Sequence, residues 1–236
     1  MTNSVNYLDK KSLNKPLIKA IIFDMDGVLI DTFEAHFHAW QKFMKHKGIS
    51  KFERRNYLES IGMQTRELLL KYKNSFGLNT ENIEKDTLLK ESMIDISEIS
   101  LYPHVKETLD ILKNNGFKLA LATSAIGVDL KDRVERYNFN ENFDAFVCSD
   151  EVKFSKPHPE IFLKAAKKLK ISLDKCVVIE DAITGIIAAK KAGMKAIALT
   201  TTFPKHKFEE MDKQFKPDLI LNDIAELPKA IPLLNC

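Results

Sequence analysis

The stretch IKAIIFDMDGVLIDT, residues 18–32, joins an apolar run to two aspartates that are separated by a single residue. The run at 18–22 has the composition of a buried β-strand. Asp24 and Asp26 follow at the point where such a strand ends. Two carboxylates this close repel each other, so the pair needs a neighbouring group that offsets its charge.

Five further segments are short and rich in β-forming residues, namely 118–123, 144–149, 175–180, 195–200 and 217–221. Several are apolar throughout, as strands covered by helices on both faces tend to be. Helical patterns lie between them. Residues 105–116 end in a glycine suited to a C-cap, and residues 159–170 begin with a proline suited to a first turn. The alternation predicts an α/β fold with a Rossmann-like parallel sheet as its core.

Residues 33–100 break this alternation because they contain no convincing strand. They predict an inserted all-helical cap domain, whose last and longest helix covers 81–97. We therefore expect a polar N-terminal lead-in at 1–16, an α/β core made of 17–32 and 101–236, and a helical cap at 33–100. Ligands bind beyond the carboxyl ends of parallel strands, so an insertion that starts at this edge is placed to act as a lid.

The composition is that of a globular chain, because 236 residues with 44% hydrophobic content can bury a large core. The 36 basic and 33 acidic residues are scattered, which gives nucleic acid little to hold. No apolar run reaches the roughly 18 residues needed to span a bilayer. The three cysteines form no CxxC pair, which favours reduced thiols. We expect a cytoplasmic monomer without nucleic-acid or membrane partners.

Polar side chains follow the predicted strands at the points where the strands end. Because parallel strands bring these ends to one edge, the side chains should converge on Asp24 and Asp26. Carboxylates gathered so densely are unfavourable without a cation, and an all-oxygen ligand set suits Mg²⁺. The sequence thus predicts a magnesium site. The converging side chains are those of Thr123, Ser124, Lys156, Glu180 and Asp181.

The same set of side chains fits phosphoryl transfer. A carboxylate can attack phosphorus to give an aspartyl phosphate, and a second carboxyl two residues on can protonate the leaving oxygen. Lysine and Mg²⁺ would share the charge on the transferring phosphoryl oxygens. The expected ligand is a small phosphorylated metabolite.

Four motifs resemble, in order, those of the haloacid dehalogenase superfamily. They are FDMDGVLIDT at 23–32, LALATS at 119–124, SKPHPEIF at 155–162 and VVIEDAITGIIAAKKAGM at 177–194. The resemblance covers residues 18–225. It is strongest to the branch that contains beta-phosphoglucomutase and sugar-phosphate phosphatases, and it implies an α/β core with a helical cap inserted after the first motif.

The resemblance implies that Asp24 is the nucleophile and a metal ligand. Asp26 would be the general acid and base, with its backbone carbonyl also on the metal, and Lys156 would bridge the nucleophile and the phosphate. In isolation Lys156 would more simply be a solvated loop lysine. Asp31 could act directly or could cap the following helix, with Glu34 completing a capping box.

The other motif residues are implied to hold the phosphate and the metal. Thr123 would hold the phosphoryl group with Ser124 beside it. Asp181 would bind Mg²⁺, with Glu180 a ligand either directly or through water. Each has a plainer alternative, because Thr123 and Ser124 could simply end a strand. Glu180 and Asp181 could favour a helix N-terminus, an effect of about 0.3 to 1 kcal/mol.

The cap decides the substrate, and its candidate residues are His36 and Arg66. His36 matches a cap-hinge histidine of beta-phosphoglucomutase, and Arg66 lies one residue out of step with that enzyme's cap arginine. Where the mutase grips a second phosphate with a Ser-Lys-Asn run, this chain has Ala125, Ile126 and Gly127, which supply no charge. We therefore predict a Mg²⁺-dependent sugar-phosphate phosphatase, with a phosphomutase, or a non-catalytic binding protein on the same scaffold, as alternatives.

Overall fold

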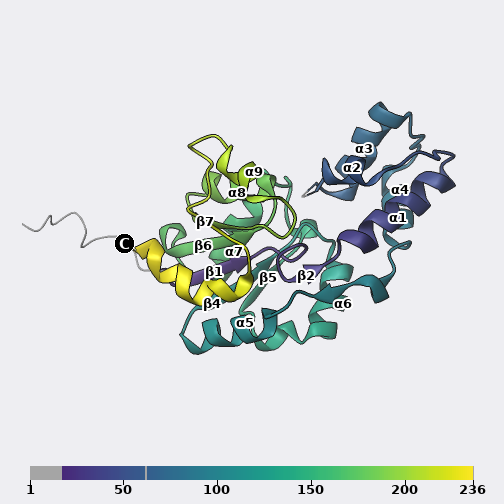
Figure 1. Cartoon of the computed structure of the whole chain (residues 1–236). Coiled ribbons are helices and arrows are strands. Elements are labelled where there is room, and N and C mark those ends of the chain that lie inside the picture. Colours follow the sequence, from purple (N-terminus) through teal and green to yellow (C-terminus); the bar gives the residue numbers. More distant parts are fainter. Residues whose placement is uncertain (1–17, 62, 236) are drawn as a thin grey trace, which may run out of the picture.

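A computed structural model of the chain describes residues 18–61 and 63–235, so the predicted lead-in at 1–16 lies outside the described residues (Figure 1). The main strands are β1 Ala20–Phe23, β4 Lys118–Ala122, β5 Ala145–Val147, β6 Cys176–Glu180, β7 Lys195–Leu199 and β8 Leu219–Leu221. They form one sheet in the order β5-β4-β1-β6-β7-β8, and every neighbouring pair is parallel. The predicted α/β fold with a Rossmann-like parallel sheet is confirmed.

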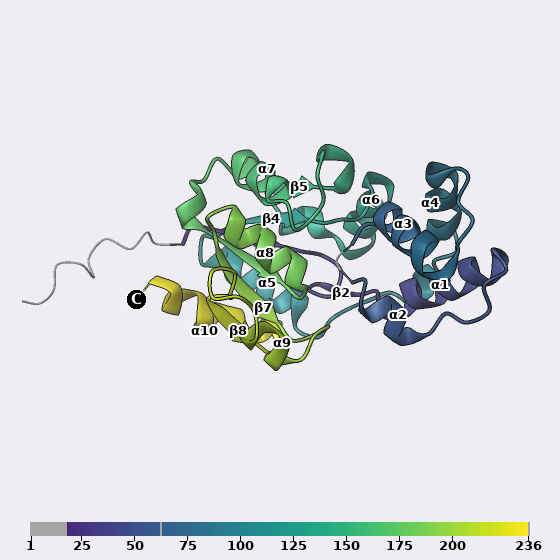
Figure 2. The same ribbon diagram turned by 90° about the horizontal axis from the view of Figure 1, so that it is seen from above.

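Alternate residues of the central strand β1 pack into two separate cores. Ile21 and Phe23 belong to one core, and Ala20 and Ile22 belong to the other. The first face of the sheet is covered by α5 Val105–Asn114, α6 Gly127–Tyr137 and α10 Leu227–Ala230. The second is covered by α7 Glu160–Leu169, α8 Ile183–Lys191 and α9 Lys205–Glu209 (Figure 2). Burial on both faces explains why these strands are apolar throughout rather than alternating.

The strand order places the end of β1 at the centre of the carboxyl edge of the sheet. Phe23 pairs in register with Leu121 of β4 and with Ile179 of β6. The residues that follow these three therefore emerge side by side. In parallel sheets a ligand crevice forms at such a point, where the connections leave on opposite faces.

The insertion between β1 and β4 folds as helices around a core of its own. The helices are α1 Phe33–His46, α2 Arg54–Leu58, α3 Thr65–Phe76 and α4 Ile83–Glu91. Aromatic rings fill this core, and the Trp40 and Tyr72 rings meet edge to face with centroids 5.0 Å apart. The helices lie beyond the carboxyl edge of the sheet (Figure 1). A two-stranded antiparallel ribbon that the sequence reasoning missed, β2 Ile30–Asp31 with β3 Ser100–Leu101, joins the helices to the sheet.

One local prediction was wrong, and one of two open alternatives for Asp31 is not realised. The last helix of the insertion covers Ile83–Glu91 and does not reach residue 97. A separate 3-10 turn follows at Ile96–Glu98, and Asp95 Oδ1 caps it by accepting hydrogen bonds from the Ser97 N–H and Oγ. The capping box of Asp31 and Glu34 does not form. Asp31 Oδ1 accepts from the Phe33 N–H at 3.2 Å, but the Glu34 carboxylate instead pairs with Arg54 at 2.6 Å.

The described residues also bear on the thiols and on membranes. Cys148 and Cys176 are free and buried, and Cys236 lies outside the described residues. Within residues 18–61 and 63–235, no helix combines the length and the apolar character required to cross a membrane.

Candidate active site

Three carboxylates meet at the carboxyl edge of the sheet. Asp24 follows β1, Glu180 ends β6, and Asp181 comes next. One oxygen from each of these carboxylates lies within 4.8 Å of the other two. Burial, together with the neighbouring carboxylates, raises the pKa of Asp24 and raises that of Asp181 to about 8. A cation at this position would offset both the cost of burying the charged carboxylates and the repulsion between them.

Lys156 supplies part of the missing positive charge. Its Nζ donates to Asp24 Oδ1 at 2.5 Å and to Glu180 Oε1 at 2.7 Å. Lys156 is only 4% exposed, so solvent is largely excluded from both contacts. Burial alone would lower the pKa of Lys156, but the two carboxylates outweigh burial and raise it. Once all three carboxylates are ionised, one lysine leaves the cluster with a net negative charge.

The oxygen atoms of the cluster fit a divalent cation. Glu180 is already occupied, because Oε1 binds Lys156 and Oε2 accepts from the N–H groups of Asp181 and Ala182 at 3.0 Å. Among the described residues, Asp26 Oδ1 is buried without a hydrogen-bond partner. Mg²⁺ takes one or two carboxylates and keeps waters, so the residues present fit it. Asp24 and Asp181 are the side chains best placed to hold the ion.

A tight turn returns Asp26 to the edge of the sheet. The Gly27 N–H donates to the Ile30 carbonyl at 2.8 Å, and the φ angle of Gly27 is +82°, a conformation that favours glycine. A Cβ at this position would lie 1.9 Å from Asp181 Oδ2. Glycine therefore allows the turn that carries Asp26 to pass against the Asp181 carboxylate.

Thr123 and Ser124 follow β4 as predicted, but they occupy different positions. Thr123 is fully buried, and its Oγ1 donates to Asp26 Oδ2 at 3.3 Å and accepts from the Ala125 N–H at 3.0 Å. Ser124 lines the cavity above the sheet edge. In this structure Thr123 orients Asp26, and the Ser124 hydroxyl is open to a ligand.

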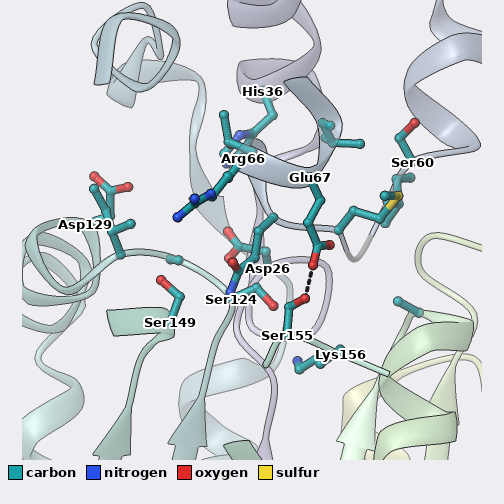
Figure 3. A pocket seen from close by; sticks show the side chains of 18 of the residues that line it. Asp26, His36, Ser60, Arg66, Glu67, Ser124, Asp129, Ser149, Ser155 and Lys156 are labelled. Atoms are coloured by element: carbon teal, nitrogen blue, oxygen red, sulfur yellow. Dashed lines mark hydrogen bonds between the residues drawn. The ribbon is translucent and has the colours of Figure 1, made fainter. Parts of the chain in front are cut away.

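A cavity of about 1000 Å³ separates the sheet edge from the helical insertion. Core residues such as Asp26, Ser124 and Lys156 face His36 and Arg66 of the insertion across it (Figure 3). The structure thus brings nearly all of the sequence-predicted site residues to one cavity, with Thr123 behind its wall. The lining includes Asp24, Asp26, His36, Arg66, Ser124, Lys156, Glu180 and Asp181.

The insertion touches the core next to the candidate catalytic lysine. Ser155 Oγ, one residue before Lys156, donates a hydrogen bond to Glu67 Oε1 of α3 (Figure 3). Arg66, the residue before Glu67, extends its side chain into the cavity in the same view. A movement of α3 would therefore break this hydrogen bond or shift the loop that carries Lys156.

His36 is held inside the insertion by a lysine. Lys90 Nζ lies 2.8 Å from His36 Nδ1 and 3.3 Å from Glu91 Oε1. Burial lowers the pKa of His36 well below its usual value, and Lys90 and Arg133 lower it further. The ring is therefore neutral at pH 7, and its Nδ1 accepts from Lys90, which leaves Nε2 for a contact with a ligand.

The pH dependence of folding should report this buried histidine. The lowered pKa means that the unfolded chain binds more protons than the folded chain below about pH 6.5. Stability should therefore fall as the pH drops below this value, by up to about 1.4 kcal/mol per pH unit from His36 alone.

Urea unfolding of His36→Gln between about pH 5 and 6.5 should show a flatter loss of stability than the wild type. His38→Gln is the matched control, because His38 lies on the same helix with its side chain 41% exposed. The same slope in His36→Gln and the wild type would show that His36 is not a buried neutral ring.

Two residues of the site were missed by the sequence reasoning. Thr202 follows β7, and its Oγ1 donates to Asp181 Oδ2. Its signal was present, because it is another polar residue beyond a parallel strand. Gly185 lies in the first turn of α8, where a Cβ would fall 1.8 Å from Glu180 Oε1. Only the packing of that helix over Glu180 reveals the need for glycine.

Comparisons with known proteins agree with this geometry. The family model of the haloacid dehalogenase-like hydrolases matches residues 21–199. A phosphorylated carbohydrates phosphatase of Thermotoga maritima is 34% identical, over 76% of this chain and 84% of its own. A beta-phosphoglucomutase of Bacillus subtilis is 35% identical, over 77% of this chain and 83% of its own.

Solved structures agree as well. CbbY from Rhodobacter sphaeroides, crystallised in complex with phosphate, superposes with a TM-score of 0.76 at 25% identity, covering 89% of this chain and 96% of its own. The predicted family is confirmed, and so is the predicted enzyme class of phosphatase. The chain belongs to the haloacid dehalogenase-like hydrolases, in the branch that holds phosphatases and beta-phosphoglucomutases.

Proposed function

We propose that this chain is a Mg²⁺-dependent phosphatase that hydrolyses a small sugar phosphate through an aspartyl phosphate on Asp24. The contact of Lys156 Nζ with Asp24 Oδ1 at 2.5 Å carries the proposal. It holds a buried carboxylate oxygen in place at the edge of a cavity large enough for a sugar phosphate. The similarity to a phosphatase of phosphorylated carbohydrates supports the choice of substrate class.

The first step transfers the phosphoryl group to the protein. Asp24 attacks phosphorus, the bond from phosphorus to the sugar oxygen breaks, and Asp26 gives that oxygen a proton. Lys156 and the Ser124 hydroxyl hold the phosphoryl oxygens, with Thr123 fixing the position of Asp26. Mg²⁺, held by Asp24, Asp181 and the Asp26 carbonyl, would supply positive charge to the same oxygens.

The second step restores the enzyme. Asp26, now ionised, takes a proton from water while the water oxygen attacks phosphorus. The bond from phosphorus to Asp24 breaks, and inorganic phosphate leaves. Glu180 keeps Lys156 in place throughout, because its two oxygens are bound by Lys156 and by backbone N–H groups.

We also propose that residues 33–100 act as the cap of this enzyme. Arg66 and His36 reach the cavity from the insertion, which supports a role for both in binding the substrate. The expected monomer and its place in the cytoplasm remain predictions.

A phosphomutase is the second candidate, and one observation favours it. The beta-phosphoglucomutase of Bacillus subtilis is 35% identical to this chain. A mutase needs a cation for a second phosphate, and Arg66 could serve as one. Ala125 and Ile126 at the opposite wall offer no charge, which favours hydrolysis.

Product analysis separates the two reactions. With β-glucose 1-phosphate, a trace of the 1,6-bisphosphate and Mg²⁺, phosphorus NMR should show inorganic phosphate accumulating with little glucose 6-phosphate. EDTA should stop the reaction. Glucose 6-phosphate that builds up many-fold faster than phosphate, and that Arg66→Ala suppresses, would establish the mutase. No phosphate release from sugar phosphates, nucleotides or phosphoglycolate would favour a non-catalytic binding protein.

A further inference from the structure

The N-terminus of α6 opens onto the cavity wall, just after Ser124, Ala125 and Ile126. A helix N-terminus in such a place is ordinarily an anion site, because its first N–H groups are free. Here a carboxylate already occupies it. Asp150 Oδ2 accepts a hydrogen bond from the Gly127 N–H at 2.7 Å. A Cβ at Gly127 would lie 2.9 Å from that oxygen, so the glycine makes room for the carboxylate.

A second carboxylate and a buried arginine stand in the same wall. Asp129 lines the cavity from the first turn of α6, and Arg133 reaches back to it from the next turn. Arg133 Nη1 donates to the Asp129 carbonyl at 3.1 Å and lies 3.8 Å from Asp129 Oδ1. Arg133 is 5% exposed, and among the described residues its buried Nε has no hydrogen-bond partner. A buried unpaired donor that borders a cavity is a group that a ligand can satisfy.

The facing helices bring two basic residues to this wall, and one of them is already paired. Lys90 of α4 is already engaged by His36 and Glu91. Arg66 extends from α3 into the cavity, on the side where Asp129 lies (Figure 3). The wall therefore offers carboxylate acceptors beside guanidinium donors, and Lys153 also lines the cavity.

We propose that Asp129, Arg133 and Asp150 form a distal subsite that binds hydroxyl groups of a monophosphorylated substrate and rejects a second phosphate. The inference rests on the proposed function and names the part of the substrate that lies away from Asp24. A hydroxyl both donates and accepts, so it can satisfy a carboxylate and a guanidinium together. A second phosphate, with a charge of about −1.5 to −2, would need the N-terminus of α6, where it meets the Asp150 carboxylate that already binds the Gly127 N–H, and it is repelled there. Repulsion of this kind is a common source of specificity.

Isosteric variants remove the charge without removing the hydrogen bonds. Asp129→Asn and Asp150→Asn are made singly and together, with Asp132→Asn as the matched control on the exposed face of α6. The Mg²⁺-loaded enzymes are assayed for kcat/KM with glucose 6-phosphate and glucose 1,6-bisphosphate. Turnover of p-nitrophenyl phosphate measures any loss at Asp24 itself.

The wild type should prefer the monophosphate by about tenfold or more, and the double variant should reduce that preference about tenfold, as expected for relief of like-charge repulsion. Asp132→Asn should keep the wild-type preference. Arg133→Lys should raise KM for glucose 6-phosphate more than it lowers kcat, because it changes binding far from phosphorus.

An unchanged preference in the double variant, or a wild type that prefers the bisphosphate, would overturn the distal subsite. A wild type that turns over p-nitrophenyl phosphate but shows no such dependence leaves the proposed function intact. Failure to turn over any of the three substrates would instead overturn the proposed function, and the subsite with it.

Discussion

Asp24→Asn should lower kcat by at least about 10⁴-fold, the size of loss seen when the nucleophile of a covalent mechanism is removed. The amide has nearly the same shape as the carboxylate but cannot attack phosphorus. The fold should survive, because the change removes one carboxylate of a buried cluster in which like charges raise the pKa of Asp24 and of Asp181. Steady-state phosphate release and thermal unfolding of the same preparation test both parts.

Asp31→Asn is the matched control, because Asp31 lies in the same segment and its side chain binds the Phe33 N–H at the start of α1. It should retain turnover close to that of the wild type. Asp24→Asn that keeps more than about 1% of kcat, with EDTA making no difference, would rule out Asp24 as both nucleophile and metal ligand.

Asp26→Asn should separate substrates by their leaving group. For a sugar phosphate, kcat/KM should fall by about 10² to 10⁴-fold, the usual contribution of a general acid. For p-nitrophenyl phosphate the loss should be below about tenfold, because nitrophenolate leaves without a proton. The ratio kcat/KM is the correct measure, since it covers the steps up to transfer of the phosphoryl group to Asp24.

Equal losses for both substrates would mean that Asp26 is not the acid. The structure gives a reason to expect the difference. Asp26 lines the cavity, and its Oδ2 accepts a hydrogen bond from Thr123, so its carboxyl group is held in position beside the space for a leaving group.

The sheet and the site residues at its carboxyl edge could be predicted because they depend on one rule. Parallel strands deliver the residues that follow them to the same edge, so Asp24, Glu180 and Asp181 meet once the strands are located. Thr202 follows the same rule, because it lies beyond the end of β7 and its hydroxyl donates to Asp181. The apolar strands themselves were identifiable because they are buried on both faces.

The parts of the site contributed by α3 of the insertion and by α6 of the core could not be predicted in the same way. Both Arg66 and Glu67 line the cavity because of how α3 is rotated against the core, and no local sequence pattern encodes that rotation. Arg133 looks like an ordinary charged residue of an amphipathic helix until the bend of its long side chain back to Asp129 is seen. The hydrogen bond of Asp150 to Gly127 joins residues 23 positions apart, and the need for glycine there is likewise a matter of packing.

Borohydride trapping tests the central claim most directly, because it identifies the atom that receives the phosphoryl group. The Asp26→Asn enzyme, whose second step should also be slow, is mixed with Mg²⁺ and p-nitrophenyl phosphate, quenched with sodium borohydride and digested for mass spectrometry. An aspartyl phosphate at Asp24 would be reduced to homoserine, and we expect this product in the peptide that contains residues 18–32 only when Mg²⁺ and substrate are both present. Reduction at another carboxylate, or turnover without any reduced peptide, would contradict the account.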